Sequence, residues 1–429
     1  MDPSFFILCF AFMALLFLSV PVAVVIGLSS ALAIVAFSKE PLEIVVTAMA
    51  QGVDKFPLLA IPFFILSGML MGHGGMAKRL IDLAAALVSR FPGGLAYVNT
   101  LACVFFGSIS GSSAAAVSSI GSFLIPEMEK KGYNKDFAVA LTVCSSTTGM
   151  LIPPSNTMIV YSVAVGGLSV GALFMAGVIP GLILGALLMC VSFFYVTKKK
   201  MKPEGVFDIA LIWKAFKRAF LSLLLIVVIL GGILSGICTP TEAAAISVVY
   251  ALILECVVYR GVKIKDLPQV FEKAAVTTSV VMVIIGASTA MSWVMNISNV
   301  PQEIAATLLS ISENKIVLLL MINFILLGVG TFMDMTPAIL IFTPIFLPIT
   351  RDLGINDIHF GIMMIANLSI GLCTPPVGTC LFLGCSVGNT NMTRLTPKIL
   401  PFVAAMLVAV ILITFVPWLS LALPDFLNQ

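Results

Sequence analysis

Charged residues are scarce in this sequence, which has 23 Lys and Arg and 20 Asp and Glu among 429 residues, or 10% in total. A water-soluble domain carries about a quarter charged residues, so this composition excludes a soluble globular protein. Hydrophobic residues make up 60% of the chain, and its mean hydropathy is +1.15. Apolar runs recur at lengths close to those needed to cross a bilayer about 30 Å thick, which predicts a polytopic membrane protein.

Histidine and paired cysteine are also scarce. The chain has two His and nine Cys, and the Cys residues are scattered through apolar segments without a C-x-x-C pair. This pattern indicates buried packing residues rather than a disulfide framework or a metal centre. An intramembrane enzyme would need converging catalytic side chains, such as paired Asp residues or an H-E-x-x-H motif. We therefore expect no catalytic residues, no enzymatic activity and no organic cofactor.

An irregular stretch occurs twice, 222 residues apart. Residues 107–116 form a Gly/Ser-rich run, and residues 149–157 (Gly-Met-Leu-Ile-Pro-Pro-Ser-Asn-Thr) interrupt an otherwise apolar segment. A shift of 222 residues aligns this interruption with residues 371–379 (Gly-Leu-Cys-Thr-Pro-Pro-Val-Gly-Thr). Over residues 126–166, nine of 41 positions are identical after the shift, and six of the nine are Gly or Pro, which fix backbone shape. The sequence therefore predicts an internal repeat.

The apolar segments predict an all-α polytopic membrane protein with about ten transmembrane crossings. The two segments that flank the Gly/Ser run have about 14 residues each, or about 21 Å as helices, which is too short to span a bilayer. We therefore expect re-entrant hairpins at 94–126 and 316–349 and discontinuous helices at 137–166 and 358–388.

This plan divides the chain into four parts. They are scaffold helices and an arm at 1–56, a first transport-domain repeat at 57–196, a cytoplasmic amphipathic segment with scaffold helices and a second arm at 197–274, and a second repeat at 275–429. If the first hairpin opens toward the cytoplasm, 19 of the 23 Lys and Arg are cytoplasmic and four lie outside, as the positive-inside rule requires. Each half then has five crossings, an odd number, so the two repeats are inverted relative to one another.

Each helix interruption removes hydrogen-bond donors, because a proline has no N–H and the carbonyl four residues earlier loses its helical partner. The prolines are Pro153, Pro154, Pro375 and Pro376, and the carbonyls are those of Gly149, Met150, Gly371 and Leu372. An unpaired carbonyl is costly in hydrocarbon, so each break should face a polar cavity or a ligand. Carbonyls and nearby hydroxyls make oxygen-rich sites suited to Na⁺, and half-helix N-termini attract carboxylates.

Two alternatives stay open from the residues alone. Gly, Ser and Ala also let membrane helices pack closely, so either irregular stretch by itself could serve packing. Asp334 is the only carboxylate in the two hairpin tips. It could couple a cation or a proton, or it could cap the half-helix that starts near Thr336.

Five motifs resemble one known family. They are Phe106-Gly-Ser-Ile-Ser-Gly-Ser-Ser-Ala-Ala115, Ile125-Pro-Glu-Met128 with Gly132-Tyr133, Gly149-x-Leu-Ile-Pro-Pro-Ser155, Phe332-Met-Asp334 and Leu372-x-Thr-Pro-Pro-Val-Gly378. In this combination, and over essentially the whole chain, the sequence resembles the large membrane subunit (DctM/SiaM-like permease) of TRAP (tripartite ATP-independent periplasmic) transporters.

The resemblance implies a Na⁺-coupled secondary importer with an elevator-type transport domain in a bacterial inner membrane. The expected substrates are organic acids, chiefly C4-dicarboxylates and sialic acid, with Na⁺ as the coupling ion and no other cofactor. The resemblance also implies a small four-helix membrane subunit, which we expect to be a separate chain, and a periplasmic substrate-binding protein. We expect no nucleic-acid partner. The alternative is a standalone Na⁺/dicarboxylate symporter that needs no binding protein.

The resemblance also implies site residues, because the family's cation sites lie at hairpin tips and helix breaks. A first Na⁺ site is expected at Ser108, Ser110, Gly149, Ile152 and Pro154. A second is expected at Gly330, Thr331, Gly371, Thr374 and Pro376. The substrate is expected at Ser112, Ser155, Asn156, Asp334, Thr336 and Thr379. No Arg lies in the tips or breaks, so no bidentate carboxylate clamp is predicted.

Overall fold

The computed structural model describes residues 3–18, 20–37, 41–203, 208–375 and 378–427. Within these residues the regular secondary structure is helical throughout and no strand forms, which confirms the all-α prediction. A helix satisfies its own backbone hydrogen bonds, so it is a form in which an apolar segment can lie in a bilayer.

The long apolar helices account for part of the predicted crossings. Among the described residues, six helices are long and apolar enough to cross a membrane, and eight spans result if each of two bent helix pairs is one span. One of the six, Lys315–Phe332, is a leg of the second predicted hairpin rather than a predicted crossing. One pair is Glu43–Val53 with Phe56–Gly72, bent by 66°, and the other is Lys135–Leu151 with Asn156–Val165, bent by 46°. A total of ten needs shorter apolar helices as well, so that count stays a prediction.

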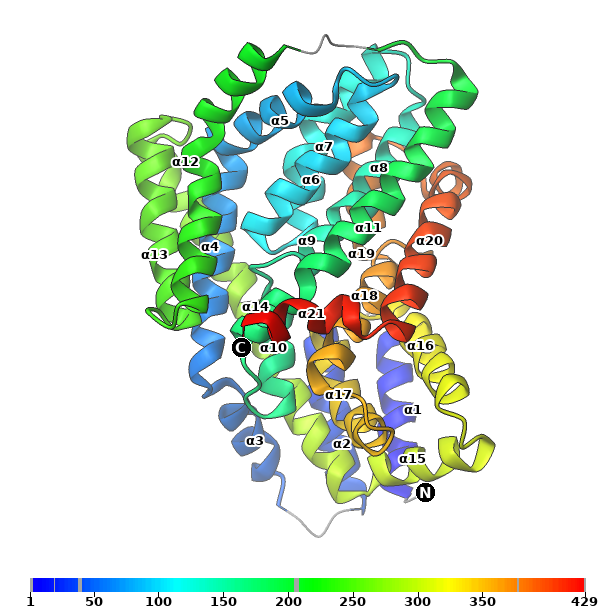
Figure 1. Ribbon diagram of the computed structural model, residues 1–429. Helices are drawn as coiled ribbons and strands as arrows, with labels where there is room; N and C mark the ends of the chain where they lie inside the picture. The colour runs from blue at the N-terminus through cyan, green and yellow to red at the C-terminus, as the bar shows by residue number, and fades with distance from the viewer. Residues whose placement is uncertain (1–2, 19, 38–40, 204–207, 376–377, 428–429) are drawn as a thin grey trace.

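A first group of helices comes from the N-terminal part and the middle of the chain (Figure 1). α4 packs against α13 and α14, and α14 also contacts α2 and α3. α1 lies against α2, and α12 lies against α13. The members are α1 (Pro3–Phe17), α2 (Val22–Phe37), α3 (Glu43–Val53), the 3₁₀ turn η1 (Phe56–Leu59), α4 (Ala60–His73), α12 (Ile209–Leu234), α13 (Pro240–Leu252), the π-helical η2 (Ile253–Val258), the 3₁₀ turn η3 (Ile264–Asp266) and α14 (Leu267–Ile297).

The second group contains the predicted hairpins and broken helices. In Figure 1, α6 and α7 lie in the upper half of the molecule and α16 and α17 in the lower half. α6 packs against α7, α8 and α9, α16 packs against α18, and α5 (Gly75–Val88) connects the groups by contacting both α6 and α12. The members are α6 (Gly94–Ser110), α7 (Ser113–Lys130), α8 (Lys135–Ser146), α9 (Thr148–Leu151), α10 (Asn156–Val165), α11 (Val170–Lys199), α15 (Val300–Ile311), α16 (Lys315–Phe332), α17 (Met335–Asp352), α18 (Asp357–Gly371), α19 (Thr379–Gly388), α20 (Met392–Phe415) and α21 (Trp418–Leu427).

The legs of both hairpins are longer than predicted. α6 has 17 residues, and α7, α16 and α17 have 18 each. At 1.5 Å per residue each leg is about 26 Å long or slightly more, so the predicted length is wrong. The difference arises at the helix ends, because α7 continues through Pro126 to Lys130, and α17 begins at Met335 and ends at Asp352, with Pro344 and Pro348 inside it. A proline removes one helical hydrogen bond, but the helix resumes beyond it.

Residues that the 222-residue shift pairs have the same local roles. Gly132 and Gly354 adopt positive φ angles of 87° and 67° in the turns before α8 and α18. Asn134 and Asn356 then cap these helices, and each side-chain oxygen accepts a backbone N–H of the first turn. A residue with a Cβ is strained at such φ angles, and an Asn oxygen replaces a missing helical acceptor. The repeated Gly and Asn residues therefore set the same turn twice.

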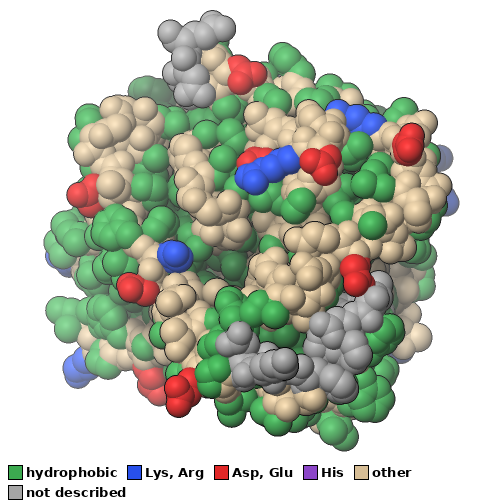
Figure 2. Space-filling view, turned by 90° about the horizontal axis from the view of Figure 1, so that it is seen from below, with side chains coloured by type: hydrophobic (Ala, Val, Ile, Leu, Met, Phe, Trp, Pro, Cys, Tyr) green, Lys and Arg blue, Asp and Glu red, His purple; other side chains and the backbone are tan. Residues whose placement is uncertain are grey.

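Basic residues gather at one end of the molecule. The end of α11 and the start of α12 lie at the top of Figure 1, and residues 198–218 include seven Lys and Arg. The opposite end, seen in Figure 2, carries scattered Asp and Glu and few Lys or Arg. This asymmetry is the one on which the predicted orientation depends.

Candidate functional site

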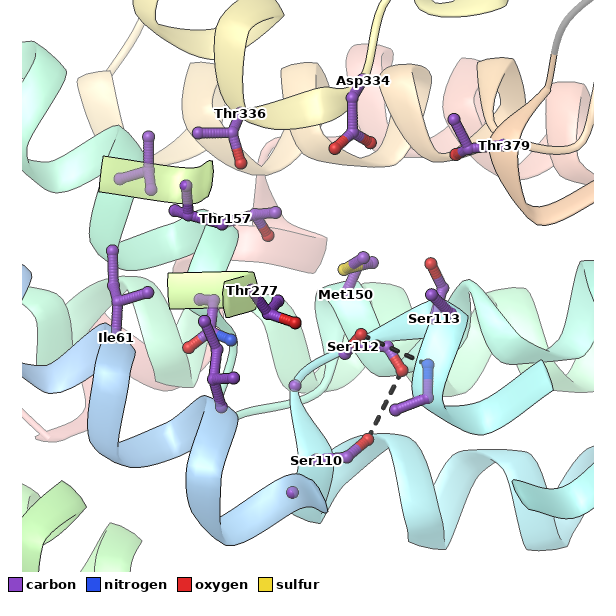
Figure 3. Close-up of a pocket in the computed structure, with 18 of the residues that line it drawn as sticks. Ile61, Ser110, Ser112, Ser113, Met150, Thr157, Thr277, Asp334, Thr336 and Thr379 are labelled. Atoms are coloured by element: carbon purple, nitrogen blue, oxygen red, sulfur yellow. Dashed lines mark hydrogen bonds between the residues drawn. The ribbon is translucent and has the colours of Figure 1, made fainter. Parts of the chain in front are cut away.

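Four helices begin at one cavity of about 290 Å³. They are α7, α10, α17 and α19, and their first residues line it. Figure 3 shows Asp334 and Thr379 on one side of the cavity and Ser110 and Ser112 on the other. The N-terminus of a helix carries a partial positive charge of about half an elementary charge and offers free N–H groups, so four such ends attract an anion.

The cavity brings together most of the predicted substrate residues. Five of the six line it: Ser112, Asn156, Asp334, Thr336 and Thr379. The sixth, Ser155, is buried and donates a hydrogen bond from its Oγ to a backbone carbonyl at 2.7 Å. Among the predicted cation residues that the structure describes, Ser110 alone lines the cavity.

Each hairpin tip lies directly against one helix break. A Cβ on Gly149 in α9 would lie 2.5 Å from the Cα of Gly107 in α6. A Cβ on Gly371 in α18 would lie 2.2 Å from the carbonyl carbon of Gly330 in α16. These distances are far below van der Waals contact, so the two backbones touch and only Gly fits. The structure therefore places tip and break side by side at both predicted cation sites.

The carbonyls at the breaks are not all bare, and this part of the prediction is wrong. The Met150 carbonyl accepts the hydroxyl of Ser155, and the Gly371 carbonyl accepts the N–H of Thr374 at 3.0 Å. The Leu372 carbonyl accepts a backbone N–H at the start of α19, at 3.2 Å. Turn-type bonds and a hydroxyl replace the missing helical donors, because buried backbone groups require partners. Each carbonyl oxygen keeps a second lone pair that a cation can contact.

The hydroxyls at the tips and breaks suit a hard cation. Ser108, Thr331 and Thr374 donate to carbonyls three or four residues earlier, at 2.7 or 2.8 Å. A hydroxyl that gives its proton to a carbonyl leaves its oxygen lone pairs for another contact, and hard cations prefer oxygen ligands. These residues therefore fit Na⁺. Pro376, which was also predicted to contribute, lies outside the described residues.

Asn156 and Asp334 offer oxygen atoms to the cavity. The Oδ1 atom of Asn156 is buried and has no hydrogen-bond partner among the described residues. An unsatisfied buried acceptor costs about 1–3 kcal/mol, so a ligand that donates to it recovers this free energy. Asp334 occupies the N-cap position of α17 without a side-chain capping hydrogen bond, and its carboxylate projects into the cavity (Figure 3). The same carboxylate also accepts the backbone N–H of Met335, the first residue of α17, so its position fits a contact with a bound group and a cap of the helix alike.

One wall of the cavity comes from two helices that the sequence analysis did not assign to the site. Ile61, Gly68 and Met69 of α4 and Thr277 and Val281 of α14 line it. An adjoining cleft of about 430 Å³ shares Met69 and Thr277 with the cavity and continues along the first turns of α14. The hydroxyl of Thr277 within an apolar segment is the sequence signal that could have indicated this wall.

A second buried carboxylate lies outside the cavity. Glu255, in the π-helical η2, is fully buried and accepts the N–H groups of Gly75 and Met76 at 2.7 and 2.9 Å. The carboxylate therefore caps the N-terminus of α5, where its negative charge is favourable. Glu255 lies outside the hairpin tips and helix breaks, so the sequence motifs gave it no role.

The two repeats meet inside the cavity. The Oγ of Ser113, in the first turn of α7, lies 3.0 Å from the Sγ of Cys380, in the first turn of α19. Both residues line the cavity, although they are 267 positions apart in the chain. The first hairpin and the second helix break thus contribute to one cavity rather than to two separate ones.

Comparisons with known sequences agree on one family. The profile of the tripartite ATP-independent periplasmic transporter DctM component matches residues 9–419. The chain is 47% identical to the protein YgiK of Salmonella typhimurium, over 96% of this chain and 95% of YgiK. It is 41% identical to the isethionate TRAP transporter permease protein DctMQ of Oleidesulfovibrio alaskensis, over 97% of this chain and 65% of that protein. It is 40% identical to the C4-dicarboxylate TRAP transporter large permease protein DctM of Pseudomonas aeruginosa, over 94% of each.

The fold is also similar to that of a solved transporter. The YdaH transporter of Alcanivorax borkumensis superposes with a TM-score of 0.63 and 13% identity, over 89% of this chain and 88% of YdaH. At this identity the similarity concerns the fold alone. The fold is that of a helical membrane transporter.

Proposed function

Since this chain belongs to the DctM family of tripartite ATP-independent periplasmic transporters, we propose that it is the large permease subunit of a Na⁺-coupled importer of organic acids. Its activity is transport rather than catalysis, as the names of the family and of its relatives indicate. The substrate is a C4-dicarboxylate, sialic acid or a similar organic acid; relatives are named for isethionate and for C4-dicarboxylates. The second candidate is a standalone Na⁺/dicarboxylate symporter without a binding protein.

The observation that supports this proposal most strongly is the convergence of four helix N-termini on one cavity. Its described lining includes no Lys, Arg or His, and Asp334 is its one charged side chain. Each helix end contributes about 0.3–1 kcal/mol to binding an anion, and up to about 2 kcal/mol in a partly buried geometry. Ligand sites usually measure about 300–1,000 Å³, so a cavity of about 290 Å³ suits a small organic acid.

Sodium ions at the two junctions of tip and break would assist substrate binding. A cation there places positive charge beside the cavity that receives the carboxylate, and two opposite charges attract more strongly in a protein interior than in water. It also holds tip and break together, which keeps the helix N-termini aimed at the cavity. In this proposal Na⁺ and substrate therefore bind cooperatively, and each raises the affinity for the other by the same factor.

We propose that the hairpins and broken helices move together as a transport unit against the first group of helices. α4 and α14 pack on α2, α3 and α13 and line the cavity from that group. This packing favours assigning them to the static part, whereas the boundaries predicted from the sequence put α4 and all of α14 beyond residue 274 in the moving repeats. Ten crossings arranged as an inverted repeat, with the first hairpin open toward the cytoplasm, complete the proposal; the basic end of the molecule supports this orientation.

The chain is a multi-pass membrane protein, and we place it in a bacterial inner membrane. In this proposal a small four-helix membrane subunit accompanies it. A periplasmic binding protein delivers the organic acid at the end opposite the basic one, and the membrane Na⁺ gradient drives uptake.

Reconstitution into proteoliposomes tests the proposal. The chain and the small subunit are given an inward Na⁺ gradient and a binding protein loaded with radiolabelled organic acid. We expect uptake that stops when either Na⁺ or the binding protein is left out. Uptake without the binding protein would favour the standalone symporter, and downhill flux without Na⁺ would contradict coupled transport altogether.

A further inference from the structure

A cleft of about 380 Å³ lies outside the substrate cavity, at the basic end of the molecule. Rings from three helices form much of its lining: Phe194 and Tyr195 of α11, Pro401 and Phe402 of α20, and Phe137 of α8. The Phe137 ring stacks on that of Tyr195 and lies 5.6 Å, centroid to centroid, from that of Phe402. Contacts between rings hold the three helices together, so the cleft is a defined apolar groove rather than a gap.

Two lysines line the same cleft. Lys198 lies in the last turn of α11, and Lys398 lies in the second turn of α20. The part of the lining that the structure describes includes no acidic residue. Asp136 follows Lys135 at the start of α8, but it is not among the lining residues and accepts the hydroxyl of Thr390 at 2.5 Å. Among its described lining residues the groove therefore presents two positive charges and no negative one.

The length of α11 sets the depth of these charges in a membrane. The helix has 30 residues, or about 45 Å, whereas the hydrocarbon core is about 30 Å thick. Its last turns therefore extend into the headgroup region, where a lysine can keep its stem on apolar surface and its ammonium in water. Phe194, one turn before Lys198, is 73% exposed and faces the surroundings of the chain.

We propose that this cleft binds an anionic phospholipid, with its phosphate between Lys198 and Lys398 and an acyl chain along Phe194, Pro401 and Phe402. Basic pockets between membrane helices on the cytoplasmic side suit such headgroups. The apolar wall favours a lipid over free phosphate, which would gain nothing from it. The site is separate from the substrate cavity and does not depend on the identity of the transported acid.

Native mass spectrometry of the purified full chain, titrated with phosphatidylglycerol, tests the proposal through the Kd of the first bound lipid. Each basic residue near an anionic headgroup contributes about fivefold in affinity, so the double variant Lys198→Ala/Lys398→Ala should bind about 25-fold more weakly. The double variant Lys198→Arg/Lys398→Arg keeps both charges and should retain binding. As a matched control, Lys214→Ala/Lys217→Ala removes two charges at the same end outside the cleft and should bind like the unaltered chain.

Four results would overturn the proposal. An equal loss in the control variant would mean that the basic end attracts anionic lipid without a site. Equally tight binding of phosphatidylcholine would show that the headgroup charge has no role. Displacement of the lipid by inorganic phosphate alone would identify a free-anion site. Unchanged lipid binding in the alanine variant, with loss of a co-purifying membrane subunit, would identify the cleft as a protein interface.

Discussion

Replacing Gly371 by Ala should separate the second hairpin tip from its helix break. The added methyl group would lie 2.2 Å from the carbonyl carbon and 2.3 Å from the carbonyl oxygen of Gly330. Carbon atoms pack best at about 3.5–4.0 Å, so the two backbones would have to move apart by roughly 1 Å. Both neighbours are backbone atoms, and no side chain can rotate away. Overpacking of this kind costs about 1–3 kcal/mol, which exceeds the gain of about 0.5–1 kcal/mol from placing Ala rather than Gly in a helix.

Two neighbouring glycines provide graded controls for this substitution. A Cβ on Gly330 would have its nearest atoms at 3.3 Å, a contact that a small shift relieves. A Cβ on Gly328, two residues earlier in the same helix, would meet nothing within 4 Å. We therefore expect Gly328→Ala to raise Tm slightly, Gly330→Ala to change it little, and Gly371→Ala to lower it by a few degrees.

The three Gly→Ala variants should also differ in the Na⁺ concentration that transport requires. If Gly371→Ala destabilises the closed, Na⁺-bound arrangement of tip and break by about 1.4 kcal/mol, the Na⁺ concentration for half-maximal uptake rises about tenfold. Thermal unfolding of the purified protein and Na⁺-dependent uptake into proteoliposomes measure the two effects. A Gly371→Ala protein with the Tm and the Na⁺ requirement of the unaltered chain would refute the close packing of tip on break.

Three further predictions concern oxygen atoms. Ser110→Ala and Thr374→Val each remove a hydroxyl, so the Na⁺ concentration for half-maximal uptake should rise about tenfold while Tm changes little; unchanged Na⁺ dependence in both would exclude these hydroxyls from cation binding. Asp334→Asn keeps an oxygen suited to an N-cap but loses the charge, so we expect normal unfolding with a weaker Na⁺ response of uptake, and a large loss of Tm would instead indicate a structural role. Glu255→Ala leaves two buried N–H groups of α5 unpaired and should lower stability by about 2–4 kcal/mol in chemical unfolding, more than Glu255→Gln, which keeps one acceptor; equal effects would contradict the capping role.

The features that the sequence predicts well are those that depend on local backbone chemistry. Pro153 and Pro154 lie between α9 and α10, and their missing N–H groups require a break in the helix at this point. Gly132 and Asn134 set the turn and the cap before α8 because positive φ and a side-chain acceptor are properties of single residues. The same residues recur after 222 positions with the same result, so the repeat could be found without any tertiary information.

The features that the sequence does not predict depend on contacts between distant residues. The hydroxyl of Ser155 donates a hydrogen bond to the carbonyl of Met150, five residues earlier. This contact depends on how the chain turns at the break, and the spacing of residues in a helix does not predict it. Glu255 is buried because the start of α5, 180 residues away, supplies two donors for its carboxylate. The wall around Thr277 forms only when α14 packs beside the hairpin tips. None of these partners can be identified from spacing in the chain.

A cavity that attracts an anion through helix ends affects the free energy of the step in which the empty transport unit moves back across the membrane. An arginine or lysine in the site would give the empty moving unit a full positive charge, and moving one elementary charge across 100 mV costs about 2.3 kcal/mol. A helix dipole adds no net charge, because its negative end moves with its positive end. In the proposed cycle the empty unit returns with at most the single negative charge of Asp334, whose outward movement an inside-negative potential favours. The membrane potential can then assist the inward step, when the charge of the bound Na⁺ exceeds the combined negative charge of the substrate and Asp334, without opposing the return of the empty carrier.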